Sequence, residues 1–382
     1  MSSGIELKKL FFCLLEALDI TAPEKVKTII QSSYILDRLL SSLGNPNKEK
    51  LILSSLYINL LNAKQGSISI QNKLLQHKIK WFENTLNYIQ SHDQDKLIPL
   101  MNTAQIVLNN INENGKLDRS IVKSYLFKPK LKKALTELID DPALLNDLNH
   151  PLLEQNIYEK LQPIHCSYQL HDYENFALFL NIWANETNPL ILPHSLALGY
   201  VVFTLSKCFN LPDDTCHRIK TAGLFHNLGK IGIDKNILDK YPYISKDEES
   251  EFQSYPYYTF KIIKHLEDIK DIVLWATYDH HRLTDMDSDK IAVLEIEIQL
   301  LAISELYVSY RQDKSHQKGL PIEKSITKLV EVTEKLFNPS IVQHLKKNLG
   351  IIEKSRKSGL KLAQKILDPE FTIEKLYASQ AV

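Results

Sequence analysis

Apolar residues recur at spacings of three and four along most of this 382-residue chain, and this periodicity constrains the fold more than any other feature. Leu7, Leu10, Phe11, Leu14 and Leu18, for example, lie on one stripe of a helix. Similar stripes run through Ile35–Leu43, Leu51–Leu61, Leu74–Ile89, Leu131–Ile139 and Phe176–Trp183. The period-two alternation of β-strands is scarce, and only 11 glycines interrupt the pattern. The sequence therefore predicts an all-α fold in which most helices bury one face.

Turn-forming residues divide the helical pattern into segments. Gly44–Asn47, Asn112–Gly115 and Asp140–Pro142 are such breaks, and each separates two helical stripes. A longer interruption lies between residues 150 and 175, where His150-Pro151 and Pro163 break the helical period. Because the length allows two domains of ordinary size, we expect a first domain over residues 1–165 and a second over residues 166–382.

The two halves of the chain resemble each other weakly at an offset of 166 residues, which places Pro46 over Pro212. Each copy has the pattern of three helices joined by turns that contain proline. Either the chain contains a repeat, or two amphipathic segments are alike by chance. If the repeat is real, the first copy could pack but not bind a metal, because Thr28, Leu60 and Leu61 stand where the second copy has His194, His226 and Asn227.

Charge is balanced over the whole chain, which has 46 Lys plus Arg and 46 Asp plus Glu, and the hydrophobic content of 44% is that of a globular protein. Such a balance gives no overall basic surface, so we expect no binding to DNA. One local basic segment, Lys128–Lys133, has the composition of an exposed helix start.

Cysteine usage and hydropathy indicate a cytoplasmic protein. The four cysteines, Cys13, Cys166, Cys208 and Cys216, lack the close pairing of a zinc ribbon, and we recognise no secretory signal. Reduced thiols and a cytoplasmic location are therefore expected. The apolar stretch Leu10–Leu15 is far shorter than the roughly 20 residues that span a bilayer, so membrane insertion is not expected.

Histidines stand at two places in the helical pattern of the second half. His194 precedes a helix that we expect over Leu196–Asn210, and a turn at Leu211–Asp214 follows it. The next predicted helix runs through Thr221–Lys230. On that helix Ala222, His226 and Lys230 would share one face, because they are spaced by four.

A second group of polar residues follows later in the chain. His280 and His281 come after an apolar helix predicted over Ile269–Ala276, and Glu305 lies in the apolar run Leu300–Tyr307. A carboxylate buried in such a run needs a partner or a cation. Four histidines and one acid could converge on a first-row transition metal. Alternatively, each of them serves packing and hydrogen bonding, which is the more frequent role of a single histidine.

The region from Phe176 to Leu349 resembles the HD-GYP branch of the HD phosphohydrolase superfamily, in particular its tandem-HD members. The matching segments are Leu192–Ser195, Ala222–Gly232, Ile237–Lys240, Tyr255–Ile263, Asp279–Arg282, Leu301–Leu306 and Phe337–Pro339. The N-terminal part is similar to the degenerate first HD copy of those proteins, which favours the repeat over chance.

The resemblance implies a metal-dependent hydrolase of cyclic dinucleotides, chiefly cyclic-di-GMP, with two or three iron or manganese ions. It implies that His194 is the first metal histidine and that His226 belongs to the HD pair. His280 and His281 match the later histidine pair, and Glu305 stands where the family has its last ligating aspartate. Lys230 matches a lysine that contacts substrate phosphate.

The sequence departs from the family pattern at positions that would hold the metals. Asn227 replaces the aspartate that bridges the ions, and Tyr255 replaces another metal histidine. The Gly-Tyr-Pro loop is absent after His281, and Leu190 stands where a third-metal glutamate can occur.

The loss of the bridging carboxylate at Asn227 has a large electrostatic consequence. Two dications ~4 Å apart repel by roughly 16 kcal/mol at an effective dielectric of 20, and an amide supplies only a dipole between them. We therefore predict that a stable two-metal site does not form. One divalent iron or manganese ion held by His194, His226 and Glu305, or by His280 and His281, remains an alternative to no metal at all.

Three alternative functions follow from these considerations. The first is a regulatory or sensing protein that binds a cyclic dinucleotide or a protein partner, with phosphodiesterase activity lost or weakened. The second is an active metal-dependent cyclic dinucleotide phosphodiesterase with an altered site, in which Lys230 and Asn227 occupy the catalytic positions. A scaffold that forms homodimers through its first HD copy is a third alternative.

Overall fold

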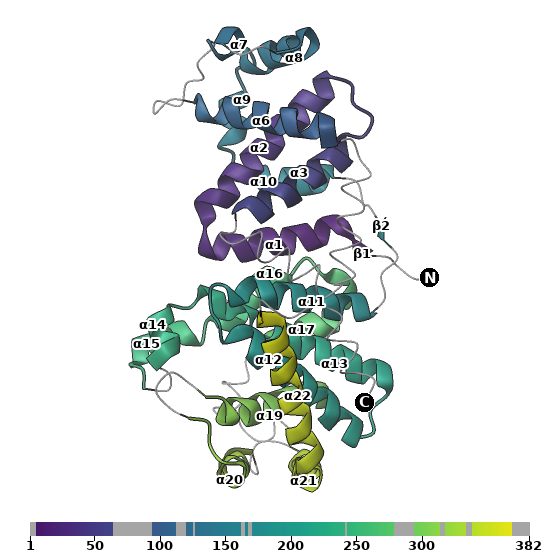
Figure 1. Ribbon diagram of the computed structural model, residues 1–382, viewed down its shortest axis with the longest axis vertical. Helices are drawn as coiled ribbons and strands as arrows, with labels where there is room; N and C mark the ends of the chain where they lie inside the picture. The colour runs from purple at the N-terminus through teal and green to yellow at the C-terminus, as the bar shows by residue number, and fades with distance from the viewer. Residues whose placement is uncertain are drawn as a thin grey trace. The chain divides into compact units, whose positions relative to one another are not determined.

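A computed structural model gives the fold of residues 5–63, 94–111, 120–124, 127–161, 165–166, 170–240, 243–278, 294–313, 318–333 and 338–368. These residues are mainly helical, which confirms the predicted all-α class (Figure 1). Within these ranges the β-structure is one antiparallel pair of two-residue strands, in which Ile5 pairs with Cys166 and Glu6 with His165. The predicted stripe over Leu74–Ile89 and the predicted turn Asn112–Gly115 lie outside the described residues.

The chain divides into two compact units. The first unit comprises Ile5–Ser67 and Glu83–Cys166, and the second consists mainly of Ser167–Val382. In chain order the first unit contains β1 (Ile5–Glu6), α1 (Leu7–Thr21), α2 (Pro23–Ser42), α3 (Lys48–Ala63), α6 (Gln94–Asn109), α7 (Ile121–Ser124), α8 (Pro129–Ile139), α9 (Leu144–Leu148), α10 (Leu153–Lys160) and β2 (His165–Cys166).

Three consecutive helices, α1, α2 and α3, pack against one another in the first unit. α1 differs from the prediction of one buried face, because Lys8, Lys9 and Glu16 are buried together with its leucines and phenylalanines. The ammonium of Lys8 donates a hydrogen bond of 2.9 Å to the carbonyl oxygen of Leu161. A buried lysine is tolerated here because its polar end has a partner.

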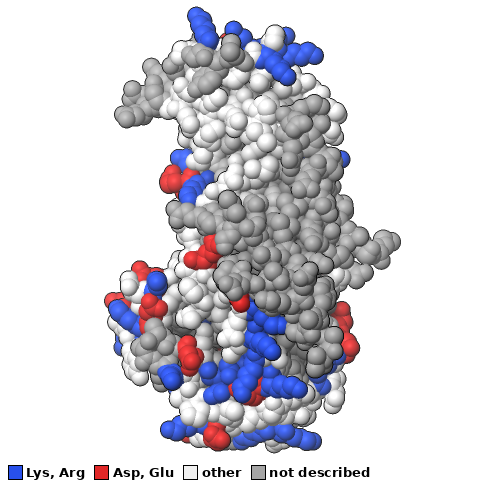
Figure 2. All heavy atoms as spheres, viewed as in Figure 1, with Lys and Arg blue, Asp and Glu red and all other residues white. Residues whose placement is uncertain are grey.

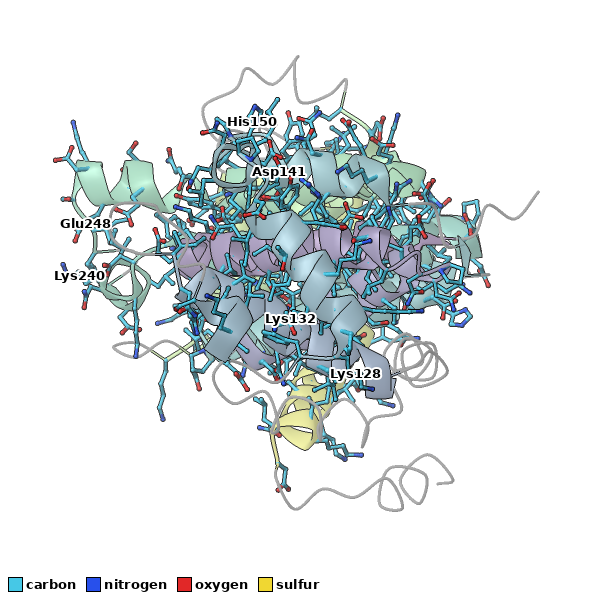
Figure 3. The ribbon with its side chains drawn as sticks, turned by 90° about the horizontal axis from the view of Figure 1, so that it is seen from above. Lys128, Lys132, Asp141, His150, Lys240 and Glu248 are labelled. Atoms are coloured by element: carbon cyan, nitrogen blue, oxygen red, sulfur yellow. The ribbon has the colours of Figure 1, made fainter. Side chains whose placement is uncertain are left out.

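The basic segment Lys128–Lys133 lies at the start of α8, which has Pro129 as its first residue. Lys128 and Lys132 are exposed (Figure 3). This confirms the predicted exposed helix start, in which proline is favoured at the first helical position.

The second unit contains a longer series of helices. They are α11 (Leu170–Asn185), α12 (Ile191–Cys208), α13 (Asp213–Phe225), η1 (Leu228–Gly232), α14 (Lys235–Lys240), α15 (Lys246–Phe252), α16 (Tyr255–Ile263), η2 (Glu267–Ile269), α17 (Lys270–Thr277), α19 (Ile296–Arg311), α20 (Ile322–Thr333), α21 (Pro339–Lys347) and α22 (Leu349–Leu367). Both η1 and η2 are 3-10 turns.

α12 is the central helix of the second unit, since it packs against α11, α13, α19 and α22. A glycine permits the closest of these approaches, because a Cβ on Gly359 of α22 would lie 2.5 Å from the carbonyl oxygen of Leu196. Among the described residues, α12 is also the one helix that is long and apolar enough to cross a membrane by composition alone. Its residues are 67% buried inside the protein, which is typical of a core helix.

Two helix boundaries around the site differ from the sequence prediction. α12 begins at Ile191 rather than at Leu196, so His194 lies in its first turn. The helix predicted to extend to Lys230 ends at Phe225, and η1 follows it after a two-residue turn. The prediction that Lys230 shares a helix face with Ala222 and His226 is therefore wrong.

Candidate functional site

His194 and Glu305 form the centre of the candidate site. His194 lies in the first turn of α12, Glu305 lies in α19, and each side chain is only 4% exposed. Nε2 of His194 lies 2.7 Å from Oε2 of Glu305. The buried carboxylate, which was expected to need a partner or a cation, thus has a histidine as its partner.

Gln312 contacts the other side of the His194 ring, because its amide oxygen lies 2.7 Å from Nδ1. Both ring nitrogens of His194 therefore have a hydrogen-bond partner. His194 and Glu305 thus form a buried histidine–carboxylate pair. The sequence analysis did not single out Gln312. Its spacing of seven from Glu305, which is two helical turns, is the signal that could have found it.

Positive charges stabilise the ionised form of Glu305. Burial raises the pKa of this carboxyl group, but His194, which also hydrogen-bonds to it, and the charge of Lys230 outweigh burial and hold the pKa well below its ordinary value. Glu305 is therefore a carboxylate at neutral pH, and the site contains one buried negative charge among several nitrogen donors.

Asn227 approaches the same carboxylate oxygen. Its Nδ2 atom lies 3.4 Å from Oε2 of Glu305, and its side chain is almost fully buried. The Oδ1 atom of Asn227 has no hydrogen-bond partner among the residues that the structure describes. The amide therefore faces Glu305 with its donor, and its buried acceptor is left without a partner.

His226, directly after α13, is held between α17 and α16. Its Nδ1 donates a hydrogen bond of 2.8 Å to the carbonyl oxygen of Ala276, which leaves Nε2 as the acceptor. The hydroxyl of Tyr255 lies 3.2 Å from Nε2 and donates to it. Burial lowers the pKa of His226, so the ring is neutral. The nitrogen of His226 that would bind a metal is thus engaged by Tyr255.

Lys230 lies in η1, close to the ring of Tyr255. Its ammonium is 5.1 Å from the centre of the Tyr255 ring and 5.9 Å from that of Phe252. Burial lowers the pKa of Lys230, while the negative charge of Glu305 raises it. Cation–π contacts with the two aromatic rings partly replace the hydration that the Lys230 ammonium has lost.

Gly229 explains why the chain leaves the α13 helix before Lys230. A Cβ at this position would lie 1.9 Å from the carbonyl oxygen of Tyr255 and 2.4 Å from the amide nitrogen of Thr259. The Gly229 amide donates to the Thr259 hydroxyl at 3.0 Å, and that hydroxyl donates to the His226 carbonyl at 3.1 Å. Backbone contact between η1 and α16, which only glycine permits, therefore sets the position of Lys230.

The described residues at this site do not fit a metal centre. Among them, no three His, Cys, Asp or Glu side chains are placed to hold one ion. Oε2 of Glu305 contacts His194 and Asn227, and Nε2 of His226 contacts Tyr255. The buried Oδ1 of Asn227, which has no hydrogen-bond partner among the described residues, offers a metal one neutral oxygen ligand, too weak to replace a bridging carboxylate.

Five of the predicted site residues lie in the described part of the second unit. His194 is in α12, Lys230 in η1 and Glu305 in α19, while His226 and Asn227 form the turn between α13 and η1. Contacts join them into one cluster, because Glu305 contacts His194 and Asn227, while Tyr255 contacts both His226 and Lys230. The other two predicted metal ligands, His280 and His281, lie outside the described residues, as do Asp279 and Arg282. A centre built on that histidine pair therefore stays a prediction.

Comparisons with known proteins find similarity over the region that holds this cluster. Residues 180–341 match the family model of the HD domain. A 3′3′-cGAMP-specific phosphodiesterase of Vibrio cholerae is 21% identical over 234 residues, which are 59% of this chain and 50% of that protein. A cyclic di-GMP phosphodiesterase of Pseudomonas aeruginosa is 23% identical over 162 residues, or 41% of this chain and 39% of that protein. The chain thus spans half or less of the length of these curated relatives.

A solved structure gives the same picture of the fold. The crystal structure of a cyclic GMP-AMP-specific phosphodiesterase of Vibrio cholerae superposes with a TM-score of 0.52 and 16% sequence identity, over 97% of this chain and 100% of that chain. The expected resemblance to HD proteins of the cyclic dinucleotide phosphodiesterase type is confirmed.

Proposed function

We propose that this member of the HD superfamily binds a cyclic dinucleotide in a regulatory or sensing role, with its phosphodiesterase activity lost or weakened. The ligand class is supported by the two relatives, which are named for activity on 3′3′-cGAMP and on cyclic di-GMP. The single observation that carries the loss of activity is the 2.7 Å contact of the Glu305 carboxylate with His194. In this contact Nε2 of His194 and Oε2 of Glu305 are partners of each other, so a metal ion would have to displace one from the other.

Hydrolysis of a phosphodiester by this class of protein depends on an activated water, which metal ions supply when they are bound. The residues of this chain compete with that role. His194 uses Nε2 to hold Glu305, His226 uses Nε2 to accept from Tyr255, and Asn227 brings no charge. Without a group that lowers the pKa of water, in-line attack on phosphorus is slow.

Binding a cyclic dinucleotide requires fewer correctly placed groups than hydrolysing it does. Lys230 carries an ammonium at the edge of the cluster and is incompletely buried, so an incoming phosphate could reach it. An ammonium is a point charge that phosphate groups bind well. We therefore assign phosphate contact to Lys230, while the His194–Glu305 pair acts as a fixed polar wall of the site.

An active phosphodiesterase is the second candidate, and the names of the relatives favour it. It would require His280 and His281 to complete a centre for iron or manganese, and it would require Tyr255 to leave Nε2 of His226. Metal content and turnover separate the two candidates.

The experiment uses the full chain, purified without oxygen. Iron and manganese are quantified, binding of cyclic di-GMP and 3′3′-cGAMP is measured by calorimetry, and products are followed by chromatography. We expect fewer than two metal equivalents, saturable binding of a cyclic dinucleotide, and no turnover. Two equivalents together with turnover would establish the enzyme instead. Absence of both binding and turnover would refute both candidates.

We also propose that the first unit is a degenerate HD copy. The location that we propose for the protein is the cytoplasm. α1, α2 and α3 pack against one another as α11, α12 and α13 do, and this supports a repeat. Thr28 lies in α2 and Leu60 in α3, where the second unit has the site histidines in and directly after the corresponding helices. A homodimer or a protein partner remains a prediction from the sequence.

A further inference from the structure

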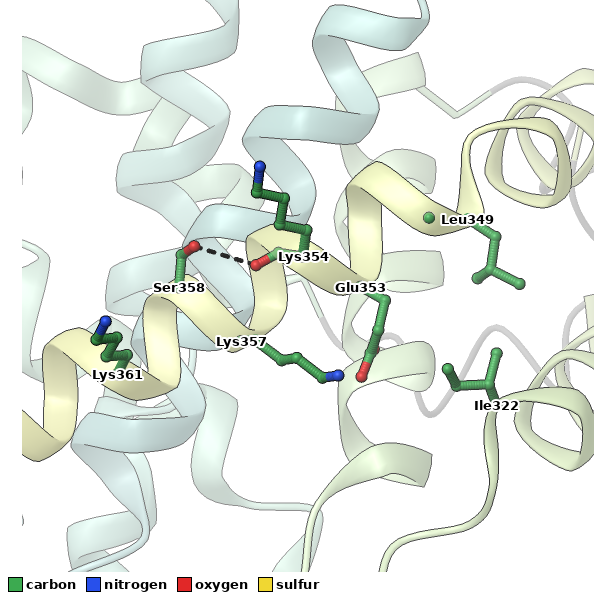
Figure 4. A pocket seen from close by; sticks show the side chains of 8 residues that line it. Ile322, Leu349, Glu353, Lys354, Lys357, Ser358 and Lys361 are labelled. Carbon is green, nitrogen blue, oxygen red and sulfur yellow. Dashed lines mark hydrogen bonds between the residues drawn. The ribbon is translucent and has the colours of Figure 1, made fainter. Parts of the chain in front are cut away.

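A groove of about 550 Å³ runs along α22 in the second unit, and no residue of the His194–Glu305 cluster lines it. Ile322 and Leu349 form an apolar end, Glu353 forms part of the wall, and Lys354, Lys357 and Lys361 lie along its length (Figure 4). The volume is in the range of sites that bind small molecules.

The three lysines make the groove basic. They come from successive turns of α22, all three are exposed, and none forms an ion pair with another residue of the described chain. Lys357 extends toward Glu353 and Ile322 (Figure 4). Figure 2 shows Lys and Arg side chains gathered over the α22 region on the face in view. Since the whole chain has a net charge of zero, this is a local concentration of charge and not a general property.

Glu353 is the one acidic residue of α22, and it does not cancel the lysines. Its carboxylate accepts hydrogen bonds from Arg311 at 3.0 Å, from Arg356 at 2.8 Å, and from the Tyr307 hydroxyl at 2.7 Å. Burial raises the pKa of Glu353, but the arginines and Tyr307 outweigh it and lower the pKa to about 2. Two guanidinium groups thus share one carboxylate, so this part of the wall also carries net positive charge.

We propose that this groove is a binding site for a small soluble anion that carries several phosphate charges. Three lysines on successive turns match adjacent phosphate groups, and the apolar end at Ile322 and Leu349 can receive an uncharged part of the ligand. A groove of this volume can hold a small soluble ligand. Arg311, which binds the Glu353 wall, precedes Gln312, which binds His194, so the groove and the HD-type cluster share the end of α19.

The test measures binding of inorganic triphosphate to the full chain by calorimetry at about 0.15 M salt, where charges farther apart than ~8 Å are screened. We expect one saturable site. The double variant Lys357→Glu/Lys361→Glu should weaken binding at least tenfold. Lys347→Glu, an exposed charge reversal on the neighbouring α21 that does not line the groove, should change binding less than twofold.

Four outcomes would overturn the proposal. These are no saturable binding, unchanged binding in the double variant, equal weakening by Lys347→Glu, and binding only to vesicles that contain an anionic lipid. Circular dichroism of each variant shows whether the fold is retained. Since the lysines are exposed, Lys357→Ala/Lys361→Ala replaces the double reversal if that variant misfolds. A parallel titration with a cyclic dinucleotide tests the proposed function by itself, so failure of the groove proposal can be distinguished from failure of the proposed function.

Discussion

Nε2 of His194 lies 2.7 Å from Oε2 of Glu305, so the first metal histidine expected from the sequence is bound to the last expected metal ligand. Because of this contact, the two expected metal ligands are hydrogen-bond partners of each other. The buried carboxylate has a hydrogen-bond partner within the protein, and each of the two side chains occupies an atom with which the other would bind a metal. The contact also defines what substitutions in the cluster should do.

Asn227→Asp should place a second carboxylate beside Glu305. Because the two like charges are buried together, we expect the metal-free variant to lose about 2–4 kcal/mol of unfolding free energy. Added Mn²⁺ should restore part of that loss, because a ligand that binds only the folded state stabilises it. Denaturant titrations with and without Mn²⁺, together with metal quantification, measure both effects.

Asn181→Asp is the matched control for this substitution. Asn181 is also fully buried and donates to the carbonyl oxygens of Ala177 and Leu224. The Asn181→Asp variant should lose unfolding free energy, and Mn²⁺ should not restore it. If Asn227→Asp is likewise indifferent to Mn²⁺, then Tyr255 or the segment after His281 limits metal binding.

Tyr255→Phe removes the hydroxyl that donates to Nε2 of His226. Loss of one hydrogen bond within the protein costs about 0.5–1.5 kcal/mol, so the unfolding free energy should fall by that amount. The double variant Tyr255→His/Asn227→Asp restores both expected ligands and should bind more metal than either single variant. Equal metal content in the wild type, Tyr255→Phe and the double variant would contradict the role assigned to Tyr255.

Gly229→Ala tests the backbone contact that positions Lys230. The new Cβ would meet backbone atoms of α16 at 1.9 Å and 2.4 Å, so either η1 or α16 has to move. We expect a loss of about 2–4 kcal/mol, measured by urea denaturation. Gly350→Ala is the control, since a Cβ there meets nothing within 4 Å in a long helix, and the change should stabilise by up to about 1 kcal/mol.

Lys230→Gln should weaken binding of a cyclic dinucleotide about tenfold, because it removes the ammonium that we assign to phosphate contact. Lys240→Gln removes a lysine that instead pairs with Glu248 on the surface at 2.8 Å, and it should leave binding unchanged (Figure 3). Calorimetry on the three proteins gives the comparison. Equal affinities throughout would exclude Lys230 from the ligand site.

Glu353 should make stability depend on pH. Its pKa is lowered to about 2 in the folded protein from an ordinary value of 4.5, so its contribution is complete above pH 4.5 and is lost as the pH falls toward 2. The difference corresponds to about 3 kcal/mol, at 1.36 kcal/mol per pH unit. Glu353→Gln should therefore be less stable than the wild type at pH 7, and the gap should narrow between pH 4.5 and pH 3. A gap independent of pH would show that packing, not charge, dominates at Glu353.

Much of the fold follows from the chain itself. The spacing of apolar residues predicts the helices over Leu51–Leu61, Leu131–Ile139 and Phe176–Trp183, and helices are found there. Local periodicity is sufficient for this, because a helix is built from contacts between residues three and four apart. The same reasoning correctly predicts that Glu305 is buried and has a partner.

Contacts between distant elements decided the rest. Sequence spacing extends the α13 helix to Lys230, but the backbone of α16 lies so close to Gly229 that the chain turns away first. No local pattern indicates that Tyr255 would donate to His226, or that Glu305 would bind His194 across 111 residues of chain. The sequence determined which segments are helical and which side chains are available for chemistry. The tertiary structure decided which of those side chains neutralise one another, because burial makes each charge depend on its nearest partner rather than on its neighbours in sequence.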